Sequence, residues 1–195
     1  LAAEVLPTRF RLGVTGSGGA VVAKRCGGAA AHEVFAAITF ARACHPAAAT
    51  LLDLGGQDAK LVRFEPTARA RPVVVMNDRC AAVTGVTLDR CLARLGLSPT
   101  DARESPFDPA AVHALSARCG VFAETDLVNL ARRGVPVRSL VASLFDAVVR
   151  SNLHALARGL TPRAPVLLLG GPHAHFPALV AAWAWHLEAL WRARG

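Results

Sequence analysis

Hydrophobic and polar positions along this chain form short apolar runs that alternate with longer segments of helical spacing. The apolar runs predict strands at 11–15, 51–54, 59–64, 72–76 and 166–169. Helical spacing and helix-end signals predict helices within 20–44, 80–95, 110–116, 125–133, 139–158 and 176–193. Residues 98–109 are polar and contain proline, which is typical of a connection. This order of strands and helices predicts an α/β fold.

The most informative stretch is Asp53-Leu54-Gly55-Gly56-Gln57-Asp58-Ala59-Lys60, which follows an apolar run. Its two glycines let the backbone approach a ligand closely, and N–H groups in such a turn can bind phosphate oxygens. Asp53 ends the strand, where its carboxylate is well placed to hold Mg²⁺ or its waters. A Gly-Gly turn alone is equally typical of a tight connection. The flanking carboxylates, amide and lysine favour a nucleotide-phosphate loop.

A second glycine pair, Gly170-Gly171, follows the apolar run 166–169. Ligands of α/β proteins bind beyond the carboxyl ends of the strands. We therefore expect one nucleotide site closed from two sides, with Gly55-Gly56 facing the phosphates and Gly170-Gly171 close to adenine or ribose. A simple strand-to-helix turn remains an equal alternative for the second pair.

The composition of the chain argues against a nucleic-acid partner and against a membrane partner. The 195 residues are 53% hydrophobic, which suffices for one large domain or two small ones. The formal net charge is +8, but Lys24 and Lys60 are the only lysines, so 20 of the 22 basic residues are scattered arginines. A nucleic-acid face requires clustered charge, so we expect no nucleic-acid partner. No stretch reaches the ~18–20 apolar residues of a membrane span, and we expect no membrane partner.

Five cysteines stand at positions 26, 44, 80, 91 and 119, with no CxxC pair and no zinc-ligand spacing. An odd count without an export signal predicts reduced thiols and a cytoplasmic protein. For Cys26, Cys44 and Cys91, the favoured interpretation is a small buried hydrophobic side chain.

Four blocks of the sequence resemble the BadF/BadG/BcrA/BcrD ATPase family, the activators of 2-hydroxyacyl-CoA dehydratases and benzoyl-CoA reductases. The blocks are LDLGGQDAK at 52–60, MNDRCAA at 76–82, CGVFAETD at 119–126 and LLGG at 168–171. Their order and separations also resemble the family, and the last third is most similar to long multidomain activase-like members. The resemblance implies an actin-like ATPase fold, in which two ribonuclease-H-like halves clamp ATP.

The resemblance also implies how the chain divides. Residues 1–50 correspond to the end of the first ribonuclease-H-like half, and residues 51–195 to the complete second half. Nothing upstream of Arg11 resembles the family's first phosphate motif, an Asp-x-Gly turn. We therefore expect most of the first half to be missing from this chain, and the chain alone to be inactive as an ATPase.

Carried over by resemblance, the second phosphate motif comprises Asp53, Gly55, Gly56 and Gln57, and the adenosine motif comprises Gly170 and Gly171. We assign Asp53 with Mg²⁺ to the phosphates, and the Gly55 and Gly56 amides to the transferred phosphoryl group. Gln57 or Asp58 would place the attacking water. Lys60 is expected on the following strand, with a structural role.

Cys80 and Cys119 match the two cysteines that, in the short activators, bind one [4Fe–4S] cluster shared by a homodimer. Two thiolates per chain and a twofold axis supply the four ligands of such a cluster. The family usually has glycine where this chain has Val83. The implied function is ATP-driven transfer of a low-potential electron to an acyl-CoA dehydratase or reductase. The implied assembly is a homodimer, or a pairing with a second activase-like domain.

Two other functions remain open from the sequence. One is a non-catalytic regulatory or scaffold domain of a longer polypeptide, and the other is a phosphotransferase related to sugar and acetate kinases. The paired cysteines Cys80 and Cys119 argue against a kinase, which has no use for a cluster site. His173 and His175 have metal-ligand spacing, but they lack carboxylate or cysteine neighbours, and we interpret them as polar loop residues.

Overall fold

The computed structural model describes residues 10–67, 70–77, 83–116, 119–157 and 159–194. These residues divide into two compact units, Leu1–Ala47 and Ala48–Gly195. Each unit contains its own sheet, two-stranded in the first unit and four-stranded in the second.

The first unit has the elements β1 (Gly13–Val14), α1 (Gly19–Cys26), β2 (Ala29–Ala30) and α2 (Glu33–Cys44). Its two strands pair in parallel. The sequence predicts helical structure throughout 20–44, and a strand interrupts it. The reason is Gly27, which ends α1 with φ 67°, a left-handed conformation that glycine adopts without strain. The chain then turns back, and Ala29 N–H donates to the Leu12 carbonyl over 2.9 Å.

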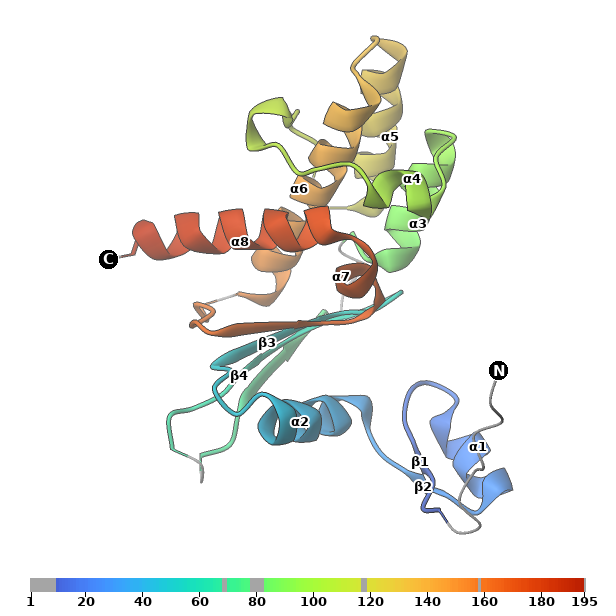
Figure 1. Cartoon of the computed structure of the whole chain (residues 1–195), viewed down its shortest axis with the longest axis vertical. Helices are drawn as coiled ribbons and strands as arrows, with labels where there is room; N and C mark the ends of the chain where they lie inside the picture. The colour runs from blue at the N-terminus through green and yellow to red at the C-terminus, as the bar shows by residue number, and fades with distance from the viewer. Residues whose placement is uncertain (1–9, 68–69, 78–82, 117–118, 158, 195) are drawn as a thin grey trace, which may run out of the picture. The chain divides into compact units, whose positions relative to one another are not determined.

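The sheet of the second unit has the strand order β5-β4-β3-β6 (Figure 1). The strands are β3 (Thr50–Leu54), β4 (Ala59–Arg63), β5 (Val73–Met76) and β6 (Val166–Leu169). Strands β3, β4 and β5 are antiparallel neighbours, whereas β6 pairs in parallel with β3. All four strands were expected from their apolar runs, and these predictions are confirmed. Central strand β3 is almost wholly buried, as its leucines require.

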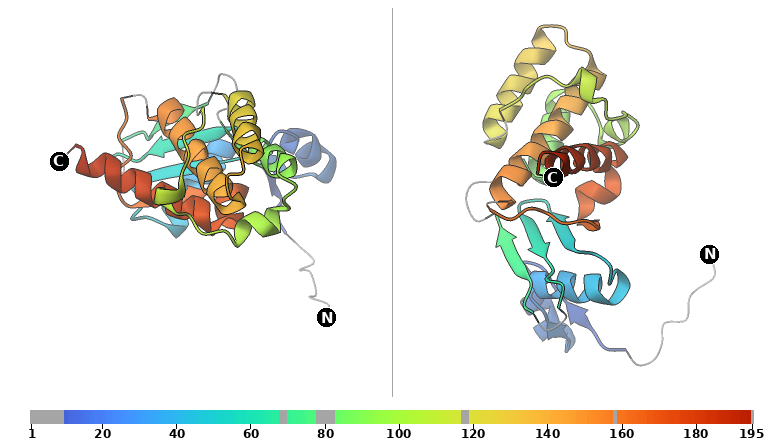
Figure 2. Two further views of the ribbon diagram at one scale, coloured as in Figure 1. Left: turned by 90° about the horizontal axis from the view of Figure 1, so that it is seen from above. Right: turned by 90° about the vertical axis from the view of Figure 1, so that its left-hand side faces the viewer.

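Helices of the second unit form a layer on the sheet and a group beyond it. They are α3 (Gly85–Arg94), α4 (Pro99–Arg103), α5 (Gly120–Arg132), α6 (Val137–Leu156), α7 (Gly171–His175) and α8 (Pro177–Arg192). Figure 2 shows α6 and α8 above the same face of the sheet. The core lies between these layers and includes Leu52, Leu61, Phe145, Val148, Leu179 and Trp183. Among the described residues, no helix is long and apolar enough to cross a bilayer.

The expected helix at 110–116 is wrong. Only a single turn of 3₁₀-helix forms, over Pro109–Ala111, and the chain continues extended from Val112. Side chains of other helices replace the helical hydrogen bonds here. His113 N–H donates to Ser143 Oγ over 2.8 Å, and Ser116 N–H donates to the Asp126 carboxylate over 2.9 Å.

Helix α5 begins earlier than expected. The sequence suggests Thr125 as its N-cap, whereas the helix starts at Gly120 and Cys119 is the residue at its N-cap. Thr125 lies inside the helix, where its hydroxyl donates to the Val121 carbonyl over 3.0 Å. Conversely, α3 starts only at Gly85, after the extended residue Thr84.

The short helices α4 and α7 were not expected. A readable signal marks α4, because Ser98 and Asp101 form a capping box around Pro99 at the first helical position. Helix α7 has only five residues and no side-chain cap, which leaves little local signal for it. It replaces the polar loop that was expected around His173 and His175.

Burial was expected for three cysteines, and the structure bears it out for one of them. Cys91 is buried in α3, and this prediction is confirmed. Cys26 and Cys44 are exposed, and the prediction is wrong for them, because each ends a helix of the first unit. Burial, reinforced by the nearby Glu124 carboxylate, raises the pKa of Cys91 to about 11. Its thiol is therefore protonated at neutral pH and inert.

Candidate functional site

Two glycine turns from distant parts of the chain meet at one end of the sheet. The first joins β3 to β4, and the second follows β6, the parallel neighbour of β3. Gly170 has φ 102°, and a Cβ at this position would overlap the Leu54 carbonyl oxygen and lie 2.9 Å from Asp53 Oδ1. Only glycine combines this backbone conformation with so close an approach. The structure thus brings together Gly55-Gly56 and Gly170-Gly171.

The first turn presents unused backbone donors. Gly55 N–H donates to the Asp58 carbonyl over 2.9 Å, which closes the turn. Gly56 and Gln57 are exposed, and within the described part of the chain their N–H groups have no acceptor. Adjacent free N–H groups in a turn can bind an anion such as a phosphate.

Lys60 lies on β4 directly opposite Asp53 on β3. Its side chain is buried, with the ammonium nitrogen 2.9 Å from Asp58 Oδ2 and 3.8 Å from Asp53 Oδ2. A buried charge requires such partners, since an unpaired one costs several kcal/mol. Lys60 therefore orients both carboxylates beside the first glycine turn, as well as lying on the expected strand.

The first turn is also fixed to the start of α3. Gly85 N–H donates to the Gly55 carbonyl over 3.1 Å, and Val86 N–H donates to the Gly56 carbonyl over 2.8 Å. A Cβ on Gly85 would lie within 3.2 Å of Gly55, Gly56 and Pro172. Sequence reasoning missed Gly85. The signal that could have found it is a glycine directly after Thr84, at the start of a predicted helix.

A cavity of about 410 Å³ opens where these segments meet. Its walls include Gly56, Gly85, Asp89, Gly171 and His175, together with apolar residues such as Phe176. We call it the turn cavity. Its volume lies in the range of ligand sites, roughly 300–1,000 Å³. Asp89, one helical turn after Gly85, is a polar wall residue that the sequence analysis did not select.

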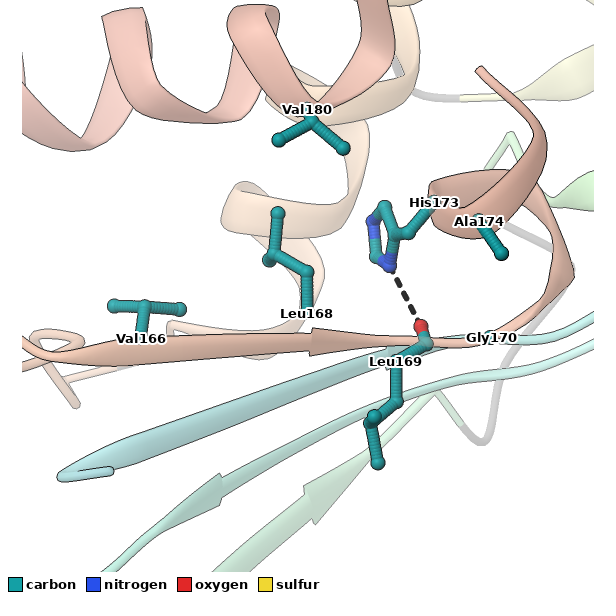
Figure 3. Close-up of a pocket in the computed structure, with 7 residues that line it drawn as sticks. All are labelled: Val166, Leu168, Leu169, Gly170, His173, Ala174 and Val180. Atoms are coloured by element: carbon teal, nitrogen blue, oxygen red, sulfur yellow. Dashed lines mark hydrogen bonds between the residues drawn. The ribbon is translucent and has the colours of Figure 1, made fainter. Parts of the chain in front are cut away.

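A second cavity of about 420 Å³ lies at the outer edge of the sheet, between β6 and α8 (Figure 3). It is lined by Val166, Leu168, Val180 and His173, and we call it the edge cavity. His173 Nδ1–H donates to the Leu169 carbonyl over 2.6 Å. Burial lowers the pKa of His173 to about 4, although that hydrogen bond opposes the shift. The imidazole is therefore neutral at physiological pH.

The candidate cluster ligands are placed unevenly. Cys80 lies outside the described residues. Cys119 is half-buried at the N-cap of α5, where the first N–H groups of the helix can interact with a negatively charged group. This position suits a ligand to an anionic iron–sulfur cluster. In the part of the chain that the structure describes, no three metal-binding side chains gather around a common point.

Val83, the first described residue after the block that contains Cys80, is fully buried. Its N–H donates to Ser151 Oγ over 3.3 Å, and its carbonyl accepts from Asn152 Nδ2 over 3.0 Å. Both partners lie on α6. The backbone that leaves the Cys80 block is thus held to the core by two side chains.

Comparison with known proteins places this geometry in a family. Residues 7–184 match the sequence model of the BadF/BadG/BcrA/BcrD ATPase family. The uncharacterized protein YjiL of Escherichia coli is 34% identical over 67% of this chain and 50% of that protein. The (R)-2-hydroxyglutaryl-CoA dehydratase activating ATPase of Acidaminococcus fermentans is 30% identical, over 63% of this chain and 46% of its own length.

A solved structure shows the same fold. The activator of the 2-hydroxyisocaproyl-CoA dehydratase from Clostridium difficile, with bound ADPNP, superposes with a TM-score of 0.77 over 91% of this chain and 65% of that one, at 24% identity. The expected actin-like ATPase fold is confirmed. The chain spans about half the length of the curated relatives it matches. It belongs to the BadF/BadG/BcrA/BcrD ATPase family.

Proposed function

We propose that this chain supplies one side of an ATP site, and that the full-length protein uses ATP to activate an acyl-CoA dehydratase or reductase. One observation carries the proposal: both glycine turns and the start of α3 converge on the turn cavity. The relatives named as activators and the ATPase family support the same class of function.

The phosphates would bind at the first glycine turn. The exposed N–H groups of Gly56 and Gln57 supply donors, while Gly55 shapes the turn through its bond to Asp58. Gln57 or Asp58 would place the attacking water. Phosphoryl transfer needs mainly positioning and charge neutralisation, which this set of residues can provide. The second turn, Gly170-Gly171, would lie beside the nucleoside.

Asp53 would hold Mg²⁺. Its carboxylate stands at the end of β3 with 21% of the side chain exposed, so it can reach a hydrated cation. Oxygen ligands and retained waters are what Mg²⁺ prefers. When bound, the cation would neutralise phosphate charge. Lys60 keeps the same carboxylate oriented toward the turn.

Cys80 and Cys119 would hold a [4Fe–4S] cluster between two copies of the domain, either in a homodimer or within one polypeptide. The two residues after Gly120 support an interface at this point, because Val121 is 60% exposed and Phe122 is 63% exposed. Exposed apolar side chains that form a contiguous patch are typical of protein–protein contact surfaces. When bound, the cluster would supply the low-potential electron for the partner enzyme.

The ATP site is tested by calorimetric titration of the full-length protein with ADP and ADPNP, with and without Mg²⁺. We expect binding that strengthens with Mg²⁺, and an Asp53→Asn variant in which the Mg²⁺ dependence is lost. Glu188→Gln is the matched control, because Glu188 is an exposed acid on α8. Absence of nucleotide binding would overturn the proposal.

The cluster is tested separately by anaerobic purification and reconstitution. We expect a brown protein with about four iron atoms per pair of domains, and loss of colour in Cys80→Ala and Cys119→Ala. Cys44→Ala is the control, since Cys44 is exposed on the first unit. A colourless protein, or iron content unchanged by either substitution, would favour a non-catalytic domain with the same fold.

A further inference from the structure

The turn cavity has two polar side chains in otherwise apolar or glycine-lined walls. Asp89 comes from α3, and His175 is the last residue of α7. Val86, Pro99, Pro172 and Phe176 provide apolar surface. A flat heterocycle with a polar attachment fits such walls, because ligand sites combine apolar surface with a few convergent polar groups.

Both polar groups have unused hydrogen-bonding capacity. His175 Nε2 is buried and has no partner within the described residues. The ring itself is held edge-on against Phe176, with ring centroids 4.8 Å apart. Asp89 forms neither a hydrogen bond nor an ion pair with any other residue that the structure describes. A ligand in the cavity would therefore meet an unpaired imidazole nitrogen and an unpaired carboxylate.

The cavity is fixed relative to the phosphate turn. Gly85 and Val86 hydrogen-bond to the Gly55 and Gly56 carbonyls, and Asp89 follows Gly85 by four residues on the same helix. Residues four apart lie on the same helical face. A ligand whose phosphates bind at Gly56 would thus extend along the face of α3 that carries Asp89.

We propose that Asp89 binds the ribose hydroxyls of the nucleotide, and that His175 Nε2 binds the edge of its base. The proposal rests on the ATP site proposed above and makes these two residues its specificity determinants. A carboxylate only accepts hydrogen bonds, and vicinal hydroxyls are paired donors spaced for its two oxygens. Removing one donor leaves a charged acceptor unsatisfied, which penalises the deoxy compound.

The experiment compares ADP with 2′-deoxy-ADP on the full-length protein by calorimetric titration. We expect 2′-deoxy-ADP to bind about tenfold more weakly than ADP. In Asp89→Ala, ADP should weaken by about the same factor, and the difference between the two nucleotides should disappear. Equal affinity of both nucleotides in the unaltered protein, or an unchanged preference in Asp89→Ala, would overturn the assignment of Asp89.

His175→Phe tests the second half of the proposal. The substitution keeps an aromatic ring against Phe176 and removes the ring nitrogens. We expect ADP to weaken about fivefold, with the preference over 2′-deoxy-ADP retained. Unchanged ADP affinity would overturn the role of His175. Melting temperatures of both variants, with Glu188→Gln as control, separate loss of binding from loss of folding.

The outcomes distinguish this proposal from the ATP site on which it rests. If neither ADP nor 2′-deoxy-ADP binds, the ATP site itself is wrong. If both bind equally well, the ATP site stands and the ribose assignment to Asp89 is wrong.

Discussion

Helix α7 has two histidines that line two cavities of nearly equal size. His175 lines the turn cavity of about 410 Å³, and His173 lines the edge cavity of about 420 Å³. Both rings have a buried Nε2 without a partner in the described part of the chain. Volume and an unpaired nitrogen therefore do not distinguish the two cavities.

The surroundings distinguish them. The turn cavity adjoins exposed backbone donors at Gly56 and contains a carboxylate, Asp89. The edge cavity is lined by Val166, Leu168 and Val180, and its histidine already donates to a carbonyl. The lesson is that a ligand site is identified by polar groups that converge on a space, and the predictions below test that distinction.

The largest effect is expected from closing the turn cavity with Gly85→Val. The new side chain would collide with Gly55, Gly56 and Pro172, each within 3.2 Å of a Cβ at this position. We expect ADP affinity to fall by more than a hundredfold. Because overpacking costs ~1–3 kcal/mol, the free energy of unfolding should also fall. Calorimetric titration and urea denaturation measure the two effects.

The matched control is Gly96→Ala. Gly96 follows the C-terminus of α3, the helix that begins at Gly85, and a Cβ at Gly96 would meet no atom within 4 Å. Gly96 has φ 70°, so this variant carries backbone strain without blocking the cavity. It should lower stability and leave ADP affinity unchanged. Retained nucleotide binding in Gly85→Val would contradict the assignment of the turn cavity.

In the edge cavity, we expect the buried His173 to make the free energy of unfolding depend on pH. The pKa of folded His173 is about 4, below its ordinary value of 6.5, so the unfolded chain binds the proton more readily. Stability from this residue is complete above pH 6.5 and is lost as the pH falls toward 4. The loss amounts to ~3 kcal/mol. Urea denaturation between pH 7 and pH 5 should show most of this slope.

His173→Gln should flatten that slope, since glutamine can still donate to the Leu169 carbonyl but does not titrate. His154→Gln is the control, at an exposed histidine of α6. Protonation of Asp146 also lowers stability, but only at a pH below the ordinary pKa of an aspartate, outside the range of this experiment. Burial raises its pKa, but hydrogen bonds from His186 and Arg150 outweigh burial and bring the pKa below its ordinary value. A slope that survives His173→Gln would contradict the assignment of this pH dependence to the buried His173.

A smaller effect is expected from Lys60→Met. The substitution keeps the length of the side chain but leaves Asp53 and Asp58 without the ammonium that lies between them. Both carboxylates are partly exposed, so solvent screens part of the repulsion, and we expect a loss of ~2 kcal/mol in stability. ADP affinity should fall about tenfold, because added negative charge repels phosphates.

The chain's only other lysine provides the control. Lys24 is exposed on α1, and Lys24→Met should change neither stability nor ADP affinity. An effect of Lys60→Met on stability alone would make Lys60 purely structural.

The sequence predicts those features of the fold and the site that depend on residues close together in the chain. The strands of the second unit coincide with short apolar runs, and α6 and α8 coincide with long segments of apolar residues at helical spacing. Their positions therefore follow from residue spacing. The two glycine pairs at strand ends could also be selected, because parallel neighbours end at the same edge of a sheet. Their mutual contact, Gly170 against Leu54, is a matter of packing.

Contacts between distant segments could not be predicted. Asp89 and Gly85 matter through their distance from Gly55 and Pro172, which no local pattern encodes. Likewise, the extended chain around His113 depends on a serine of α6, thirty residues away. Tertiary hydrogen bonds replaced the helix that local propensity favoured.

The smallest effect should come from filling the edge cavity with Val180→Phe. Val180 lies on α8 above β6, and its side chain borders the cavity (Figure 3). A phenyl ring adds buried apolar area and meets no polar group except His173, so stability should change by less than ~1 kcal/mol. ADP affinity should stay within twofold of the unaltered protein. The comparison is informative because added volume at Gly85 is expected to lower ADP affinity more than a hundredfold. A loss of ADP affinity in Val180→Phe, measured by the same titration, would mean that the two cavities are coupled through α7.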